Sequence, residues 1–126
     1  MYDLQAAESC IIQPRSKRSI STGIVLDLEK GYFGKIYGRS GLAFHHNVHT
    51  LTGIIDQGFR GELRVLLNNH SFESFHVNKY QRIAMLEICK KPDIVLIEMD
   101  KCSDLTATDR SKNGFGSTGL RRRNNI

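Results

Sequence analysis

The chain has 126 residues, of which 40% are hydrophobic and 25% charged, and its formal net charge is +5. This length predicts one domain with a real core, and the composition is that of an ordinary soluble globular protein. It excludes a membrane span, because no run of about 18 apolar residues is present, and the N-terminus lacks the layout of a signal peptide. The three cysteines have no Cys-x-x-Cys spacing, which argues against a disulfide scaffold or a zinc ribbon. We therefore expect an intracellular protein of the cytoplasm or nucleus.

The positive charge indicates an anionic partner. Part of it lies in the terminal run Arg121–Arg123, which is typical of a solvated tail, with a nuclear-import or nucleic-acid patch as the alternative. Basic residues interleaved with aromatics along a strand or helix are absent. We expect no direct binding to nucleic acid.

Short segments rich in β-branched and aromatic residues alternate with turn residues along most of the chain. We predict strands at 19–28, 33–38, 61–69, 74–78, 82–89 and 93–99. Only 41–50 is suited to a helix, and then a short one. This pattern predicts an all-β sandwich or barrel over residues 1–105. Beyond it the composition turns polar, which predicts a C-terminal arm at 106–120 and a basic tail at 121–126.

The first candidate site is GRSGLA, residues 38–43, which follows a predicted strand. An arginine, a hydroxyl and approachable backbone N–H groups are suited to holding an anion such as phosphate. A simple turn with a surface arginine is the commoner explanation for such a segment.

The second candidate is HHNVH, in which His45 and His49 have the spacing of a helical zinc pair. Without a nearby Glu or Cys to complete the set, ordinary surface or core histidines are favoured.

The segment GIIDQGFRGE, residues 53–62, places Asp56 between an apolar step and a glycine-bracketed turn. Gly58 and Gly61 permit a tight hairpin around Phe59. A carboxylate on a stiff hairpin suits a general base that holds one water molecule in one place. A carboxylate that caps its own turn is the alternative, and the segment alone does not separate the two.

The last candidate is NGFGSTG, residues 113–119, in the predicted arm. Its glycines allow it to wrap a ligand, Phe115 could stack on a base, and the hydroxyls and amides could meet phosphate oxygens. Arg110 could add a bidentate fork. A disordered Gly/Ser tail is the alternative, although a phenylalanine between two glycines is unusual in a linker.

Taken in order, five segments resemble the five ordered motifs of the trimeric dUTP nucleotidohydrolases (dUTPases): YDLQAA, GRSGLA, GIIDQGFRGE, RIAML and RSKNGFGSTG. The resemblance covers Tyr2 to about Leu120. It implies a jelly-roll-like β-barrel and a homotrimer in which each active site is shared between subunits and closed by the C-terminal arm. It further implies that the protein hydrolyses dUTP to dUMP and pyrophosphate with the assistance of Mg²⁺. This reaction limits uracil in DNA and supplies dUMP for dTMP synthesis.

The resemblance also implies roles for single residues. Asp56 matches the general base that activates the water attacking the α-phosphorus. Asp3 matches the aspartate that orients waters on a magnesium ion held mostly by the triphosphate. The substrate-binding positions comprise the phosphate motif, the hairpin whose backbone contacts uracil, the ring beneath the deoxyribose, and the arm residues that contact the γ-phosphate and stack on uracil. Arg39, Ser40 and Gly41 form the phosphate motif, Gly53 and Ile55 belong to the hairpin, and Phe59 is the ring beneath the deoxyribose. The arm residues are Arg110, Phe115, Gly116, Ser117 and Thr118.

The chain departs from the family pattern at several positions. Phe59 stands where the family has a tyrosine, and Gly38 stands where it has a proline. Met85 replaces a glutamine that contacts the hydrated phosphate–magnesium unit, and Tyr80-Gln81 replaces a Gly-Asp pair. The chain begins within the first motif, so we expect Asp3 to be frayed. These departures leave an alternative function: a catalytically weakened module of this fold that acts as a protein-binding or regulatory factor. A related deaminase acting on dCTP is disfavoured, because no glutamate is placed as its acid–base group.

Overall fold

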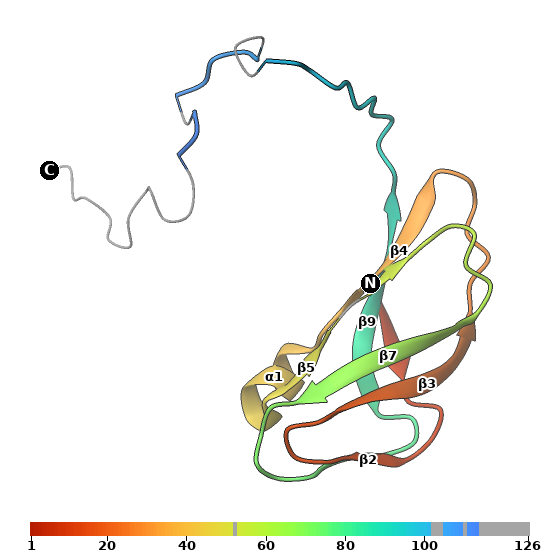
Figure 1. Cartoon of the computed structure of the whole chain (residues 1–126). Coiled ribbons are helices and arrows are strands. Elements are labelled where there is room, and N and C mark those ends of the chain that lie inside the picture. The colour runs from red at the N-terminus through yellow and green to blue at the C-terminus, as the bar shows by residue number, and fades with distance from the viewer. Residues whose placement is uncertain (52, 102–104, 110, 114–126) are drawn as a thin grey trace, which may run out of the picture. The chain divides into compact units, whose positions relative to one another are not determined.

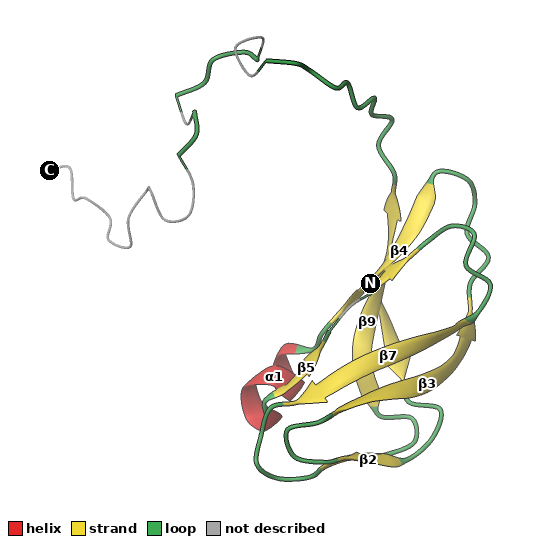
Figure 2. Ribbon diagram, in the orientation of Figure 1, coloured by secondary structure: helices red, strands yellow, loops and turns green. Residues whose placement is uncertain are grey.

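The computed structural model describes residues 1–51, 53–101, 105–109 and 111–113. The chain divides into two compact units, Met1–Asp93 and Ile94–Ile126. All strands and the helix of the described residues lie in the first unit (Figures 1 and 2). Within the described residues, no helix has the length and apolarity needed to cross a membrane.

The described residues of the first unit form nine strands and one helix. In chain order they are β1 (Tyr2–Gln5), β2 (Cys10–Ile12), β3 (Lys17–Val25), β4 (Tyr32–Tyr37), α1 (Ser40–His46), β5 (Val48–Thr50), β6 (Ile54–Ile55), β7 (Glu62–Asn69), β8 (Phe75–Val77) and β9 (Arg82–Lys90). The strands form three antiparallel sheets, ordered β1-β9-β4-β6, β3-β7-β5 and β2-β8. The predicted all-β class is confirmed.

Alternation of apolar and polar residues determines which face of each strand is buried. In β7, Leu63, Val65 and Leu67 are completely buried, while the residues between them are exposed or partly exposed. They pack in one core with side chains from β1, β2, β3, β8 and β9. The buried polar residue Asn69 is satisfied: its amide donates to the carbonyls of Ile12 and Glu73 at 3.2 and 2.7 Å.

The predicted helix at 41–50 is confirmed in its first part only. It ends at His46, and the following Asn47 adopts a left-handed backbone (φ 53°) and donates its N–H to the Ala43 carbonyl at 3.1 Å. Residues 48–50 instead form β5, which pairs with the end of β7. Strands β1, β2 and β6 were not predicted. Asp3 is not frayed, because it lies in β1 opposite Met85 of β9.

The predicted strand at 93–99 is wrong, since no residue of 93–99 is in a strand. Ile94, Val95, Leu96 and Ile97 have exposed fractions between 69% and 91%. High β-propensity describes how a side chain fits against a neighbouring strand, and no strand of the described residues pairs with this segment. The segment is therefore an exposed apolar run in the single chain.

Candidate active site

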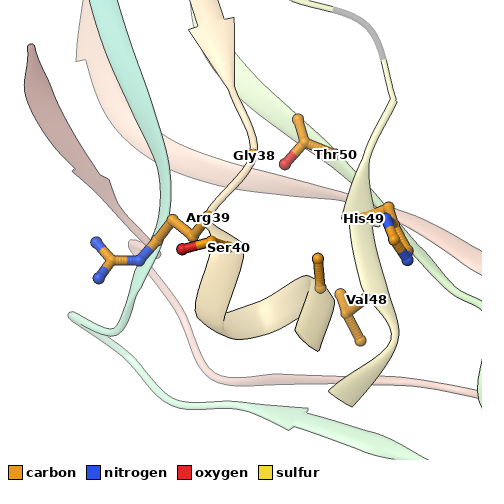
Figure 3. A pocket seen from close by; sticks show the side chains of 7 residues that line it. Gly38, Arg39, Ser40, Val48, His49 and Thr50 are labelled. Carbon is orange, nitrogen blue, oxygen red and sulfur yellow. The ribbon is translucent and has the colours of Figure 1, made fainter. Parts of the chain in front are cut away.

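The phosphate motif predicted at Arg39–Gly41 lies where β4 leads into α1. Arg39 keeps an extended backbone (φ −98°, ψ 127°) and accepts the first helical hydrogen bonds, from Leu42 and Ala43 at 3.1 and 3.2 Å. The helix starts at Ser40, and a side chain at Gly41 would meet only open space. A hollow of about 330 Å³ adjoins the motif (Figure 3), lined by Gly38, Arg39, Ser40, Ala43, Val48, His49 and Thr50. The backbone and hydroxyl of this corner are therefore accessible to a ligand.

Asp3 joins the phosphate motif to β9 through two ion pairs. Its Oδ1 lies 2.6 Å from Nη1 of Arg39, and its Oδ2 lies 3.3 Å from Nη1 of Arg82. Two guanidinium groups share one carboxylate, so the cluster keeps a net positive charge. That charge suits an anionic ligand. Arg82 was not predicted as a site residue: it belongs to the RIAML motif, but only the β1–β9 register shows that it meets Asp3.

Asp56 follows β6 and begins a β-turn. The N–H of Phe59 donates to the Asp56 carbonyl at 3.0 Å, which closes the turn through the backbone alone. The Asp56 carboxylate accepts no hydrogen bond and forms no ion pair with any residue in the described ranges, and Asp56 is exposed. The turn-cap alternative is therefore not what the structure shows. Both carboxylate oxygens are left available to a ligand or a water molecule.

The predicted hairpin around Phe59 is wrong in its pairing. The strand before the turn, β6, pairs with β4 through Ile55–Gly34 and Ile54–Lys35, whereas β7 after it belongs to another sheet. Residues 56–61 thus cross between two sheets. The approach to β4 is close: a Cβ at Gly53 would lie 2.6 Å from the Ile36 carbonyl oxygen, so only glycine fits there. The backbone at Gly53, three residues before Asp56, is therefore packed directly against β4.

The turn after Asp56 is also held from outside. Nη1 of Arg60 donates to the carbonyls of Gln57 and Phe59 at 2.8 and 3.2 Å, and its Nη2 pairs with Asp27 at 2.7 Å. The ring of Phe59 lies over Gly61, where a Cβ would come within 2.6 Å of it. The glycine therefore permits the observed ring position. Phe59 remains 42% exposed, so one part of its ring is free to contact a ligand.

Asp56 and the Arg39–Gly41 motif lie at different places along β4. Ile55 is opposite Gly34, so Asp56 falls near Phe33, six positions before Arg39 in the chain. At the rise of an extended strand, this separation is roughly 20 Å. Figure 1 shows α1 and the connection leading into β7 well apart. One chain therefore does not bring the two predicted halves of the site together.

The histidine segment forms no metal centre. No group of three metal-ligating side chains occurs among the described residues. His49 shares a 3.0 Å hydrogen bond with the Asn47 side chain, and its ring lies 5.1 Å from that of His70, edge to face. His45 and His46 are exposed, as the surface interpretation predicted. The predicted arm residues Arg110, Phe115, Gly116, Ser117 and Thr118 lie outside the described residues.

Comparison with known proteins decides the family. The family model described as dUTPase matches residues 1–119. The chain belongs to the dUTPase family. It is 43% identical to the deoxyuridine 5'-triphosphate nucleotidohydrolase of Nautilia profundicola over 94% of this chain and 82% of that protein. It is 40% identical to the fowlpox virus protein of the same name, over 95% of this chain and 83% of that protein.

Solved dUTPase structures share the fold. The dUTPase of Staphylococcus bacteriophage 80alpha, solved with dUpNHpp, superimposes with a TM-score of 0.84 at 24% identity, over 94% of this chain and 85% of that one. A mutant dUTPase from phage phi11 of S. aureus, described with a structural Mg(II) ion, gives 0.72 at 21% identity, over 80% of this chain and 83% of that one. The dUTPase fold predicted from the five motifs is confirmed.

Proposed function

We propose that this dUTPase-family chain hydrolyses dUTP to dUMP and pyrophosphate, which limits uracil in DNA and supplies dUMP for dTMP synthesis. The proposal depends on the setting of Asp56. Its carboxylate is exposed and has no partner among the described residues, and its turn is held by Gly53, β4 and Arg60. The curated relatives named above are called deoxyuridine 5'-triphosphate nucleotidohydrolases. We place the activity in an intracellular compartment, the cytoplasm or the nucleus.

In the proposed reaction Asp56 accepts a proton from a water molecule. The water oxygen forms a bond to the α-phosphorus, the bond from that phosphorus to the bridging oxygen breaks, and pyrophosphate leaves with the bonding electrons. Phosphoryl chemistry of this kind depends on positioning and charge neutralisation more than on covalent help. A carboxylate with no competing hydrogen bonds on a restrained backbone meets the positioning requirement.

The cluster of Arg39, Arg82 and Asp3 meets the charge requirement. Its net positive charge, together with the accessible backbone at Ser40 and Gly41, is suited to the oxygens of a triphosphate. The backbone beside Gly53 and Ile55 would bind the uracil edge, and Phe59 would pack under the deoxyribose. A ring packed there leaves little room for a 2′-hydroxyl. Arg110, Phe115, Gly116, Ser117 and Thr118 of the arm would complete the site.

Magnesium fits this site as an ion carried by the substrate. The described residues offer no cluster of ligands, but Asp3 is a partly exposed carboxylate beside the phosphate motif. Mg²⁺ usually keeps several waters and binds through substrate phosphates plus few carboxylates. Bound to the triphosphate, it would neutralise charge, and Asp3 would accept hydrogen bonds from its waters.

We also propose that the active unit is a homotrimer with shared sites. Two observations support it. Strand register places Asp56 and Arg39 of one chain roughly 20 Å apart. This distance is too great for one bound nucleotide to place its attacking water at Asp56 and its phosphates at Arg39 of the same chain. The run Ile94–Ile97 exposes four large apolar side chains, an arrangement typical of a surface covered in an oligomer. A neighbouring copy would supply the missing half of each site.

Pyrophosphate release from four nucleotides tests the proposed function. With Mg²⁺ present we expect release from dUTP and little from dTTP, dCTP or UTP, and we expect chelation of the metal to slow the dUTP reaction. Measurement at several protein concentrations reports whether activity requires assembly. Equal rates with dUTP and UTP would contradict the proposed pocket. Absence of turnover at every concentration would favour the regulatory alternative.

A further inference from the structure

The turn that carries Asp56 is bound by a side chain to which the motif comparison assigns no role. Arg60 reaches back over its own turn and donates from Nη1 to two carbonyls, those of Gln57 and Phe59, at 2.8 and 3.2 Å. Its Nη2 lies 2.7 Å from Oδ1 of Asp27, in the connection between β3 and β4. We call Arg60 and Asp27 the turn clamp.

The clamp acts where the turn is least restrained. Gly58 lies between the two bound carbonyls, and nothing stands within 4 Å of the place where its Cβ would be. A glycine without packing neighbours has the widest choice of backbone conformations. Because a peptide unit is planar, fixing the carbonyls of Gln57 and Phe59 also fixes the N–H groups that follow them. The two hydrogen bonds therefore restrict the peptides on both sides of the Gly58–Phe59 step.

The clamp contributes little to the stability of the fold. The side chains of Arg60 and Asp27 are 55% and 86% exposed. Exposed ion pairs of this kind add little to folding because water and salt screen them. A geometric role is different, since a misplacement of about 1 Å in a site can reduce a rate by about 100-fold. The clamp is thus suited to setting geometry without supporting the core.

We propose that Arg60 is a positioning residue that orients both Asp56 and Phe59, and that Asp27 in turn orients Arg60. The backbone carbonyl of Asp56 accepts the hydrogen bond that closes the turn, and the N–H of Phe59 donates it, so a looser turn moves both residues together. The inference rests on the proposed function and deepens it. Loss of the clamp reduces turnover through Asp56, and it weakens rejection of the 2′-hydroxyl through Phe59.

The test compares Arg60→Ala, Arg60→Lys and Asp27→Asn with the wild-type chain. Arg18→Ala is the matched control, because Arg18 is also exposed and donates to a backbone carbonyl, that of Ile11 at 3.0 Å, away from the turn. For Arg60→Ala we expect kcat on dUTP to fall by about 10- to 100-fold and the preference for dUTP over UTP by about 10-fold. Arg60→Lys should recover part of both, because lysine keeps the charge without the fork. Asp27→Asn should show a smaller loss, and Arg18→Ala none.

Hydrogen exchange of the backbone amides in 53–62 gives a readout that does not depend on activity. We expect faster exchange in Arg60→Ala within this segment and unchanged exchange in β9 and in the rest of β7, residues 63–69. Wild-type exchange in this segment, or a wild-type kcat and wild-type dUTP/UTP ratio in Arg60→Ala, would overturn the inference. A wild-type chain without dUTP hydrolysis would refute the proposed function instead, and exchange would still decide whether the clamp orders the turn. Thermal melting identifies any variant that fails to fold; Arg60→Lys and Asp27→Asn then carry the same test.

Discussion

Tyr80 occupies a backbone conformation that side chains rarely adopt. Its φ is 68°, in the left-handed region, and the turn around it is held by hydrogen bonds from Tyr80 N–H to the Ala6 carbonyl (2.8 Å) and from Gln81 N–H to the Asn78 carbonyl (3.0 Å). The family pattern has glycine at this position, which adopts such a backbone without steric cost. Tyr80 is 67% exposed, and its ring has a cation–π contact with Lys79, whose Nζ lies 5.0 Å from the ring centre.

Tyr80→Gly should therefore stabilise the fold. Removing the left-handed penalty is worth about 1–2 kcal/mol, and the lost exposed cation–π contact and the greater freedom of glycine in the unfolded chain offset most of it, so we expect a net gain of at most about 0.5 kcal/mol. Tyr80→Ala is the control, because it removes the ring and keeps the penalty. Chemical denaturation measures both. A Tyr80→Gly chain less stable than the wild type would show that the ring contributes more than the backbone costs.

For single residues, the sequence could predict which chemical groups belong to the site but not which partners they contact. Asp56 and Arg39 stand in recognisable motifs, so their candidacy follows from residue type and order. The contact of Asp3 with Arg39 and Arg82 depends on the register of β1 on β9, which no local pattern encodes. The proposed role of Arg60 does not follow from the sequence for the same reason: Asp27, its partner, lies on a different connection.

A single carboxylate joins the start of β7 to an irregular part of β3. The register between the two strands shifts between Ser21 and Val25, and Gly23 in the shift has a left-handed φ of 71°. Oε1 of Glu62 accepts hydrogen bonds from the Ser21 hydroxyl and, at 2.7 Å, from the Gly23 N–H. These bonds, that of Ser21 first, lower the pKa of Glu62. β7 thus begins at a fixed point directly after the turn that carries Asp56.

This lowered pKa predicts an acid-dependent contribution to stability. The folded-state pKa lies below the ordinary 4.5, so the stabilisation is complete above pH 4.5 and is lost as the pH falls through the folded-state pKa. Glu62→Gln should reduce stability at neutral pH and make the difference from the wild type shrink in acid. Denaturation of both chains from neutral pH down into the acid range measures it, with Glu73→Gln as a control at an exposed position. A difference that is constant with pH would refute the assignment.

The length of an element determined in most cases whether it could be predicted. The exception is β8, which has three residues but alternates apolar Phe75 and Val77 with polar His76, and it lies within the strand predicted at 74–78. Strands β3, β4, β7 and β9 have six to nine residues, long enough for alternation to show, and all four were predicted. Strands β1, β2, β5 and β6 have two to four residues and exist only because a longer strand or a neighbouring short one pairs with them. The apolar run at 93–99 has the composition of a strand but pairs with none in the described chain.

Each complete site of the whole molecule, on our account, combines two chains. The separation of roughly 20 Å between Asp56 and Arg39 follows from the pairing of β6 with β4, and no motif on its own shows it. A sequence pattern reports which groups the reaction needs, whereas their assembly depends on the fold and on the contacts between copies. We propose that the exposed apolar run at 94–97 contributes to such contacts.

Shared sites predict that two inactive variants rescue each other. In the proposed site Asp56→Asn would lack the base and Arg39→Gln would lack the phosphate contact, so each variant alone should be nearly inactive on dUTP. In equal mixtures that reassemble at random, about a quarter of the sites would pair an intact base with an intact Arg39 from the neighbouring chain. We expect about that fraction of wild-type activity. No recovery after verified subunit exchange would place both residues of each site on one chain.

Asp56→Asn tests the proposed role of Asp56 as the general base of a dUTP hydrolase. Asp56→Asn keeps the size and turn geometry of the side chain and removes its ability to accept a proton. We predict that it binds dUTP with nearly wild-type affinity and releases pyrophosphate at least about 100-fold more slowly than the wild type under the same Mg²⁺ concentration. Unchanged pyrophosphate release by Asp56→Asn would show that Asp56 is not the base.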